Sequence, residues 1–221
     1  MSRLGGFAAL AVVLLAPSFA VAQPAAGTPG RIEISGGVVW IGGYDAGSRD
    51  ATESSNSSTG GAPLTLFRTS SRVRPVTGFE GHAAFYLSSR VAAEGLFQLS
   101  KPQVRVKTAD DFENAAAAEV VGGISSYVFG GSLVYHFGSG KVVPFVLGGG
   151  AYLRLLDEDN AEVVTGNEFH GGGGVKVWFS EGPSRLGLRV DAQMSSRSKS
   201  AGFEDTRRVL PAVSAGLTYR F

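Results

Sequence analysis

The last nine residues, VSAGLTYRF (213–221), decide how the rest of the sequence is interpreted. Alternate residues of this stretch are apolar and end on two aromatic rings, Tyr219 and Phe221, whereas the residues between them are small or polar and include Arg220. Side chains that alternate with a period of two belong to a β-strand with one apolar face. Chain ends are usually frayed and polar. The stretch therefore predicts an amphipathic strand that ends in contact with a nonpolar environment.

The other end of the chain indicates which environment this is. Arg3 precedes an apolar run over 4–15, and the small residues Ala20 and Ala22 come just before Gln23. This is the layout of a secretory signal peptide over residues 1–22, followed by a flexible leader over 23–30. The alternative is a membrane-spanning helix, but the apolar run is shorter than the roughly 20 residues that a span needs. We expect an exported chain with one domain over 31–221.

Composition narrows the class of protein. The chain has 221 residues, no cysteine, a formal charge of +1, 32 glycines and only 18% charged residues. An exported chain can do without disulfides, and a near-neutral chain lacks the basic footprint of a nucleic-acid binder. Export, abundant glycine and little charge favour a β-rich protein.

The period-two pattern of the last strand recurs along the whole mature chain. Long and short connections alternate between these segments, and the short ones, at 88–90, 138–141 and 180–183, suit tight hairpins. Long loops at one end and short turns at the other predict an all-β fold, an eight-stranded antiparallel up-and-down transmembrane β-barrel. The expected strands lie within 31–44, 76–87, 91–100, 124–137, 142–156, 169–179, 185–194 and 209–221, and the long loops are 45–74, 101–119, 157–168 and 195–207.

The charged residues are expected to point into this barrel. One face of the strands is long, aromatic and nearly free of charge, which suits lipid, while the other collects ions of both signs among glycines and serines. Buried charges of opposite sign can pair, whereas an unpaired one is costly. A soluble periplasmic lipocalin-like barrel, with its apolar face inside, is the alternative. The predicted lumen ion network consists of Glu80, Glu94, Arg154, Lys176, Arg189, Asp191 and Arg220.

Aromatic residues gather near the short turns. Membrane proteins place such rings at the level of the lipid headgroups, which would explain an apolar chain end. The last strand must also pair with the first to close the barrel. The predicted aromatic girdle consists of Phe85, Tyr135, Phe137, Phe145, Phe179, Tyr219 and Phe221.

With its signal peptide, eight alternating strands, PFVLGGGAY (144–152) and terminal LTYRF (217–221), the chain resembles the small OmpA/OmpX-type outer-membrane β-barrels. The resemblance implies a monomer in the cell outer membrane of a Gram-negative bacterium, in contact with outer-membrane lipids and lipopolysaccharide. It also implies that Leu217, Tyr219 and Phe221 form part of the signal that the outer-membrane barrel assembly machinery recognises. It does not imply a particular biochemical activity.

Catalytic and metal-binding candidates are weak. His170 opens a His-Gly-Gly-Gly run and Ser214 lies in AVSAG, but both fall in mid-strand, without the strand-turn-helix context of esterase motifs. A lipid A-modifying outer-membrane enzyme, a further alternative, would need a histidine facing lipid, and all three histidines are expected to point inward. The acidic run DEDN (157–160) is better explained as a solvated loop than as a cation site. We expect no catalysis, no cofactor and no metal.

Function is therefore expected at the outer surface. The first and fourth long loops should be neighbours, because the strands that they flank close the barrel, and together they hold many cations. Arginine binds phosphate well, so these cations could contact lipopolysaccharide, although a solvated rim is the simpler explanation. The sequence predicts a structural or surface-interaction role, by adhesion or lipopolysaccharide contact, without a sizeable pore. The predicted outer-rim basic patch consists of Arg68, Arg72, Arg74, Arg197, Lys199, Arg207 and Arg208.

Overall fold

A computed structural model of the chain describes residues 29–53, 64–109, 117–157, 163–180, 184–198 and 207–221. The expected signal peptide, most of the expected leader, Lys199 and residues 158–160 of the DEDN run lie outside these ranges. The strands are β1 (Ile32–Ile41), β2 (Tyr44–Glu53), β3 (Leu64–Val73), β4 (Val76–Tyr86), β5 (Val91–Ser100), β6 (Gln103–Ala109), β7 (Ala118–His136), β8 (Val142–Asp157), β9 (Val163–Trp178), β10 (Arg185–Arg197) and β11 (Arg208–Arg220).

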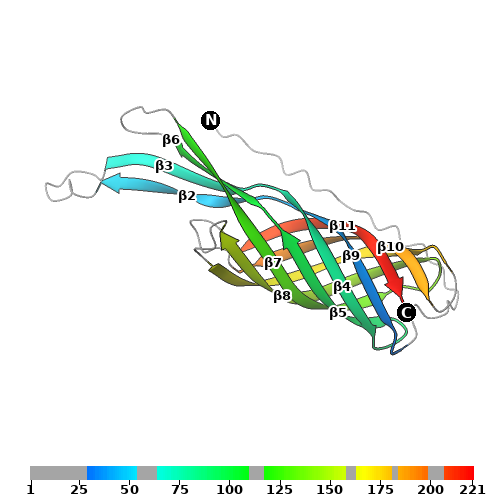
Figure 1. The fold of residues 1–221 in the computed structure, drawn as a ribbon. Helices are drawn as coiled ribbons and strands as arrows, with labels where there is room; N and C mark the ends of the chain where they lie inside the picture. The colour runs from blue at the N-terminus through cyan, green and yellow to red at the C-terminus, as the bar shows by residue number, and fades with distance from the viewer. Residues whose placement is uncertain (1–28, 54–63, 110–116, 158–162, 181–183, 199–206) are drawn as a thin grey trace, which may run out of the picture.

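Eight of these strands form a closed antiparallel barrel in the order β1, β4, β5, β7, β8, β9, β10, β11. The first and last strands close the ring, with Ile34 opposite Tyr219 and Gly36 opposite Leu217. The expectation of an all-β, eight-stranded antiparallel barrel is confirmed (Figure 1). Within the described ranges, no helix is long and apolar enough to cross a membrane.

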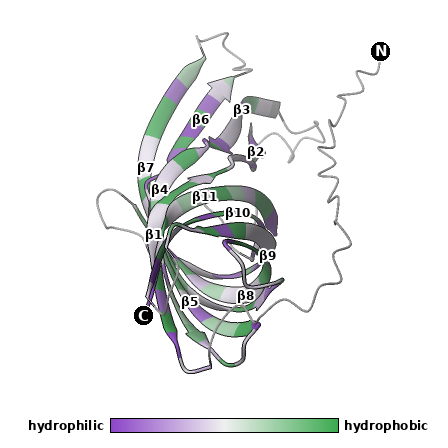
Figure 2. Cartoon of the chain, turned by 90° about the vertical axis from the view of Figure 1, so that its right-hand side faces the viewer, coloured by the Kyte–Doolittle hydropathy of each residue, from purple (hydrophilic) through white to green (hydrophobic). Residues whose placement is uncertain are grey.

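The remaining strands continue one side of the barrel wall. β2, β3, β6 and the first residues of β7 pair in that order, which is the order of β1, β4, β5 and β7 below them. The resulting four-stranded sheet, here called the extension, stands beyond the ends of β8 and β9 (Figures 1 and 2). The expectation of loops over 45–74 and 101–119 is wrong for the described parts of these segments. Their polar residues pair as strands because each continues a strand that already has a neighbour, so pairing, rather than an apolar face, fixes their structure.

A seam separates the extension from the barrel. Three of the four strands are interrupted there by two residues that include glycine or proline, whose backbones break regular pairing. β7 alone passes through the seam without a break. The interruptions are Gly42–Gly43 between β1 and β2, Arg74–Pro75 between β3 and β4, and Lys101–Pro102 between β5 and β6.

The two faces of the barrel wall differ in chemistry. Outward residues include exposed large apolar side chains such as Ile34, Phe79 and Phe129, and an apolar outer surface of this extent is typical of a surface that contacts lipid. Inward glycines allow the strands to approach closely. A Cβ on Gly37 would lie 2.2 Å from the Ala215 carbonyl oxygen across the β1–β11 pair.

Candidate functional site

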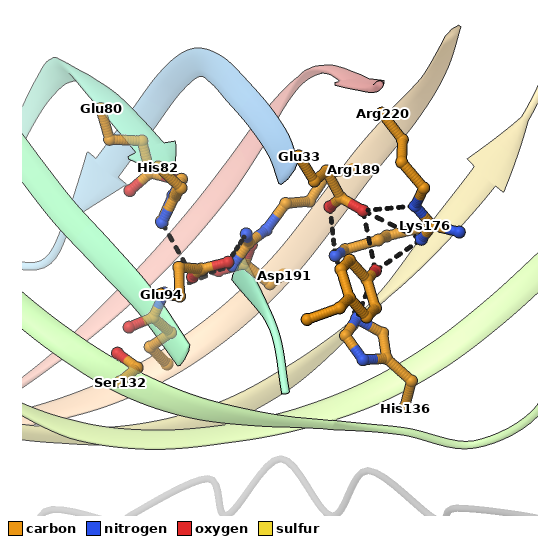
Figure 3. A network of polar contacts seen from close by, with 12 residues as sticks. Glu33, Glu80, His82, Glu94, Ser132, His136, Lys176, Arg189, Asp191 and Arg220 are labelled. Carbon is orange, nitrogen blue, oxygen red and sulfur yellow. Dashed lines mark hydrogen bonds and ion pairs between the residues drawn. The ribbon is translucent and has the colours of Figure 1, made fainter. Parts of the chain in front are cut away.

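Near the short turns, a buried carboxylate joins five strands across the lumen. Glu33, on β1, accepts hydrogen bonds from Tyr86 Oη at 2.8 Å, from Arg220 Nη2 at 3.0 Å, and from Lys176 Nζ. Lys176 Nζ also lies 3.0 Å from Nε2 of His136. The strands involved are β1, β4, β7, β9 and β11, so these side chains fill this end of the barrel (Figure 3).

A second cluster lies further along the lumen. Arg189 on β10 donates to both oxygens of Glu94 on β5, at 2.6 and 3.0 Å, and its Nε donates to Asp191 at 2.9 Å. β5 and β10 are on opposite sides of the ring, so the two hydrogen bonds from Arg189 to Glu94 (the Arg189 fork) span the lumen. His82 lies between Glu80 and Glu94, with one ring nitrogen 3.0 Å from each (Figure 3).

Of the predicted lumen network, Glu80, Glu94, Lys176, Arg189, Asp191 and Arg220 are buried in these two clusters. The expectation that Arg154 points inward is wrong, because Arg154 is exposed on β8. Phe145 also differs from the expectation of a girdle position, since it is buried in the lumen with its ring 4.9 Å from the Arg189 guanidinium.

These two errors have one physical cause. β8 is apolar on both of its faces, so its alternation does not say which face is inside. Pairing decides instead: Phe145 lies opposite His136, and residues directly opposite in an antiparallel pair point to the same side. Because His136 points inward, so do Phe145, Leu153 and Leu155, while Arg154 points outward.

The other predicted girdle residues are exposed at the short-turn end. The rings of Tyr219 and Phe221 meet edge to face with centroids 4.8 Å apart, and those of Tyr135 and Phe137 at 5.0 Å. The remaining exposed members are Phe85 and Phe179.

The mouth of the lumen is closed by apolar side chains. Ile41 and Leu210 pack together on one side, and Val128 and Leu153 on another. The cavity among these side chains measures about 20 Å³, which is room for about one water molecule. The sequence did not indicate these inward apolar residues, since the apolar face was expected to lie outside.

A serine–histidine contact occurs inside the lumen. Ser132 Oγ lies 2.7 Å from His170 Nε2, and both residues are buried. Among the described residues, His170 Nδ1 has no hydrogen-bond partner, whereas the histidine of a Ser-His-Asp triad donates its Nδ1 proton to an acid. Nor do the described histidines and carboxylates form a cluster that could hold a metal ion.

The residues of the predicted basic patch differ in exposure, and they do not all lie on one surface. Arg68, Arg72 and Arg74 are exposed on or beside β3. Arg207 is exposed, and Arg208 is half-buried at the start of β11. The expectation of an exposed Arg197 is wrong, because it is buried and its Nε lies 2.5 Å from a carboxylate oxygen of Glu168.

Two further cations, Arg105 and Lys107 on β6, join the β3 arginines on the extension. They are absent from the predicted basic patch because the sequence predicts a loop over 101–119. Nearby, the Arg68 guanidinium donates to both oxygens of Asp50, at 2.7 and 3.2 Å, and holds the pKa of Asp50 below its usual value.

No protein-family model and no curated protein matches the sequence. Solved structures do match. The outer membrane protein OprG from Pseudomonas aeruginosa is 13% identical over 88% of this chain and 97% of its own, with a TM-score of 0.58. Ail, the attachment invasion locus protein of Yersinia pestis, is 14% identical over 88% of this chain and 100% of its own, with a TM-score of 0.41. The OprG match shows that the chain has the fold of the small outer-membrane β-barrels, as the resemblance implied.

Proposed function

We propose that the chain is a monomeric integral protein of the cell outer membrane with a closed lumen, and that it acts through its extension in a structural or surface-interaction role. The observation that carries this proposal is the position of the extension: four paired strands stand beyond a barrel in which side chains from opposite strands meet. Export by a cleaved signal peptide over residues 1–22 and insertion by the barrel assembly machinery belong to the same proposal.

The outer surface of the barrel supports a membrane location. Large apolar side chains are exposed around the wall, and among them Phe79 is 68% exposed and Leu133 61%. Water-soluble barrels keep such residues inside. The inward ions support the same reading, since the soluble lipocalin-like alternative would place charge outside.

The interior supports a role other than conduction or catalysis. Side chains from opposite strands meet in the lumen, and Arg189 and Glu94 join across it. An eight-stranded barrel has room only for side chains or one small ligand. A lipid A-modifying enzyme needs its catalytic groups on the lipid-facing surface. The contact between Ser132 and His170 is instead buried in the lumen.

The topology can be tested with thiol labelling, because the chain contains no cysteine. Thr65→Cys places one thiol at an exposed position of β3, and Ser180→Cys places one in the short connection after β9. We expect a membrane-impermeant maleimide to label Thr65→Cys on intact cells, and Ser180→Cys only after lysis.

A gel that compares unheated with boiled samples tests insertion itself. The folded barrel should migrate differently in detergent before and after boiling. Equal migration with recovery in the soluble fraction would overturn the membrane proposal, and labelling at position 180 alone on intact cells would overturn the orientation.

A further inference from the structure

A hollow of about 500 Å³ lies on one face of the extension, and its polar lining is mainly basic. Arg72 on β3 lies directly opposite Arg105 on β6, and Ser70 lies directly opposite Lys107. Opposite residues of an antiparallel pair share one face, so the three cations surround the same hollow. Arg74, at the seam, also lines it.

The cations outnumber the carboxylates around them. Arg105 Nε lies 2.9 Å from Glu119, and Lys107 Nζ lies 3.7 Å from the same carboxylate. Arg72 lies 3.7 Å from Asp45, and both side chains are about two-thirds exposed, so this pair is weak. Four cations therefore face two carboxylates, and the acids sit on the flanks of the hollow rather than at its centre.

Two arginines directly opposite each other repel and destabilise a sheet. An anion between Arg72 and Arg105 would turn this repulsion into attraction. Guanidinium groups bind phosphate in bidentate geometry, with two parallel hydrogen bonds each. The hollow has the chemistry of a site for a multiply charged phosphate group, with the Ser70 hydroxyl as an additional donor.

The direction in which the hollow faces indicates the source of the phosphate. Val73 and Val104 point toward the lumen mouth, where they line its cavity. Arg72 and Arg105 are their neighbours in sequence and point the opposite way. Their face therefore continues the apolar outer surface of the barrel and faces sideways over the membrane.

The height of the hollow agrees with this source. Trp40, exposed on the outer surface, lies opposite Thr77, and such rings mark the membrane boundary. With a rise of about 3.3 Å per residue and a tilt of about 40°, Arg72 lies roughly 13 Å above Thr77. A ligand anchored in the outer leaflet, with phosphorylated sugars above its acyl chains, reaches this level.

We propose that Arg72, Arg105 and Lys107 form a binding site for the phosphate groups of lipopolysaccharide molecules in the surrounding leaflet. This inference rests on the proposed orientation, with the extension outside the cell. It names the contact that the extension makes, and it replaces the predicted patch, whose Arg197 lies inside the barrel.

The test uses the mature chain, refolded in detergent and titrated with fluorescent lipopolysaccharide while anisotropy is recorded. We expect Arg72→Gln combined with Arg105→Gln to raise the Kd at least tenfold. Arg154→Gln is the matched control, because Arg154 is also an exposed arginine but lies on β8, away from the hollow; its Kd should change less than twofold. Lipopolysaccharide stripped of phosphate should compete poorly, and added salt should weaken the binding of the unaltered chain.

Each contrary result is informative. An unchanged Kd in the double variant, or an equal loss in Arg154→Gln, would overturn the site. Inorganic phosphate competing as well as lipopolysaccharide would overturn the lipid source, and tighter arginine-dependent binding of heparin would assign the hollow to a sulfated polysaccharide. The gel of unheated and boiled samples and the labelling of Thr65→Cys, an exposed position of β3 outside the lining of the hollow, are run in parallel. If they fail, the proposed function is wrong, whereas if only the titration fails, the phosphate site alone is wrong.

Discussion

Glu94 shows what one carboxylate does inside the barrel. It accepts both hydrogen bonds of the Arg189 fork and lies 3.0 Å from His82. Removing one partner of a buried ion pair leaves an uncompensated charge. We expect Glu94→Ala to lower the free energy of unfolding by about 3–5 kcal/mol, measured by urea unfolding of the refolded barrel in lipid.

Glu119→Ala is the matched control. Glu119 also pairs with an arginine, Arg105, but both side chains are about one-third exposed, and such surface pairs contribute about 1 kcal/mol or less. Equal losses in the two variants would show that burial does not set the strength of the Glu94 contact.

β1 and β11 approach closely at Gly37, and this predicts how much stability an added methyl group would cost there. Gly37 lies opposite Gly216, and a Cβ on Gly37 would lie 2.2 Å from a backbone oxygen. Gly36, one residue away, has its nearest atom at 3.7 Å. We expect Gly37→Ala to destabilise the barrel by about 1–3 kcal/mol and Gly36→Ala to change its stability by less than about 1 kcal/mol, by the same unfolding assay. A larger loss in Gly36→Ala would contradict the close approach of β1 and β11 at Gly37.

Single residues also show how far sequence reasoning reached into the site. Lys176 and Arg189 were predicted to point inward because their strands have one clearly apolar face. Phe145 and Arg154 were misplaced because both faces of β8 are apolar. Glu33 was missed although it shares the inward parity of β1, since its partners on β4, β9 and β11 become neighbours only when the barrel closes.

At the scale of the element, β11 ends in a fixed position. The Phe221 amide donates to the Ile32 carbonyl at 3.0 Å, and Arg31 donates to the Phe221 carbonyl at 2.8 Å. If the terminal residue is also the assembly signal that the resemblance implies, deleting Phe221 should leave the protein in the periplasm, while the purified chain still folds in detergent. Fractionation of cells that express the variant measures this.

Phe137→Ala is the control for this deletion. Phe137 is an exposed aromatic residue next to Tyr135 at the same end of the barrel, so its loss should cost only the roughly 1–3 kcal/mol of lost apolar burial. Normal outer-membrane levels of the Phe221 deletion would rule out the signal role and leave the barrel assignment intact.

The elements differ in how far the sequence predicted them. The barrel strands were found because alternation and short turns are local signals. β2, β3 and β6 were not found, because they are polar on much of both faces. They pair in the order of the barrel strands that they continue, and this order is not visible in their own sequence. Register between neighbours is a property of the assembled sheet, and the sequence of one strand does not contain it.

For the whole molecule, the side chains in the lumen predict that ions do not pass through the barrel. Ionic contacts join strands across the lumen, and at the mouth the buried pair of Arg197 and Glu168 lies beside packed apolar side chains. We expect the refolded protein in a planar bilayer to give no stable current steps, although the gel of unheated and boiled samples shows that it is folded. A large, lasting conductance would mean that the side chains move aside and that the lumen is a channel.

The seam has a mechanical consequence. Three strands of the extension are joined to the barrel through a pair of irregular residues, while β7 crosses the seam as continuous strand. A force applied to the tip of the extension should therefore bend the sheet about the seam, with β7 as its spine, before it separates strands of the barrel. The barrel would keep its shape while the extension yields. On the proposed orientation, a contact made under shear at the cell surface need not disturb the buried ion pairs of the lumen.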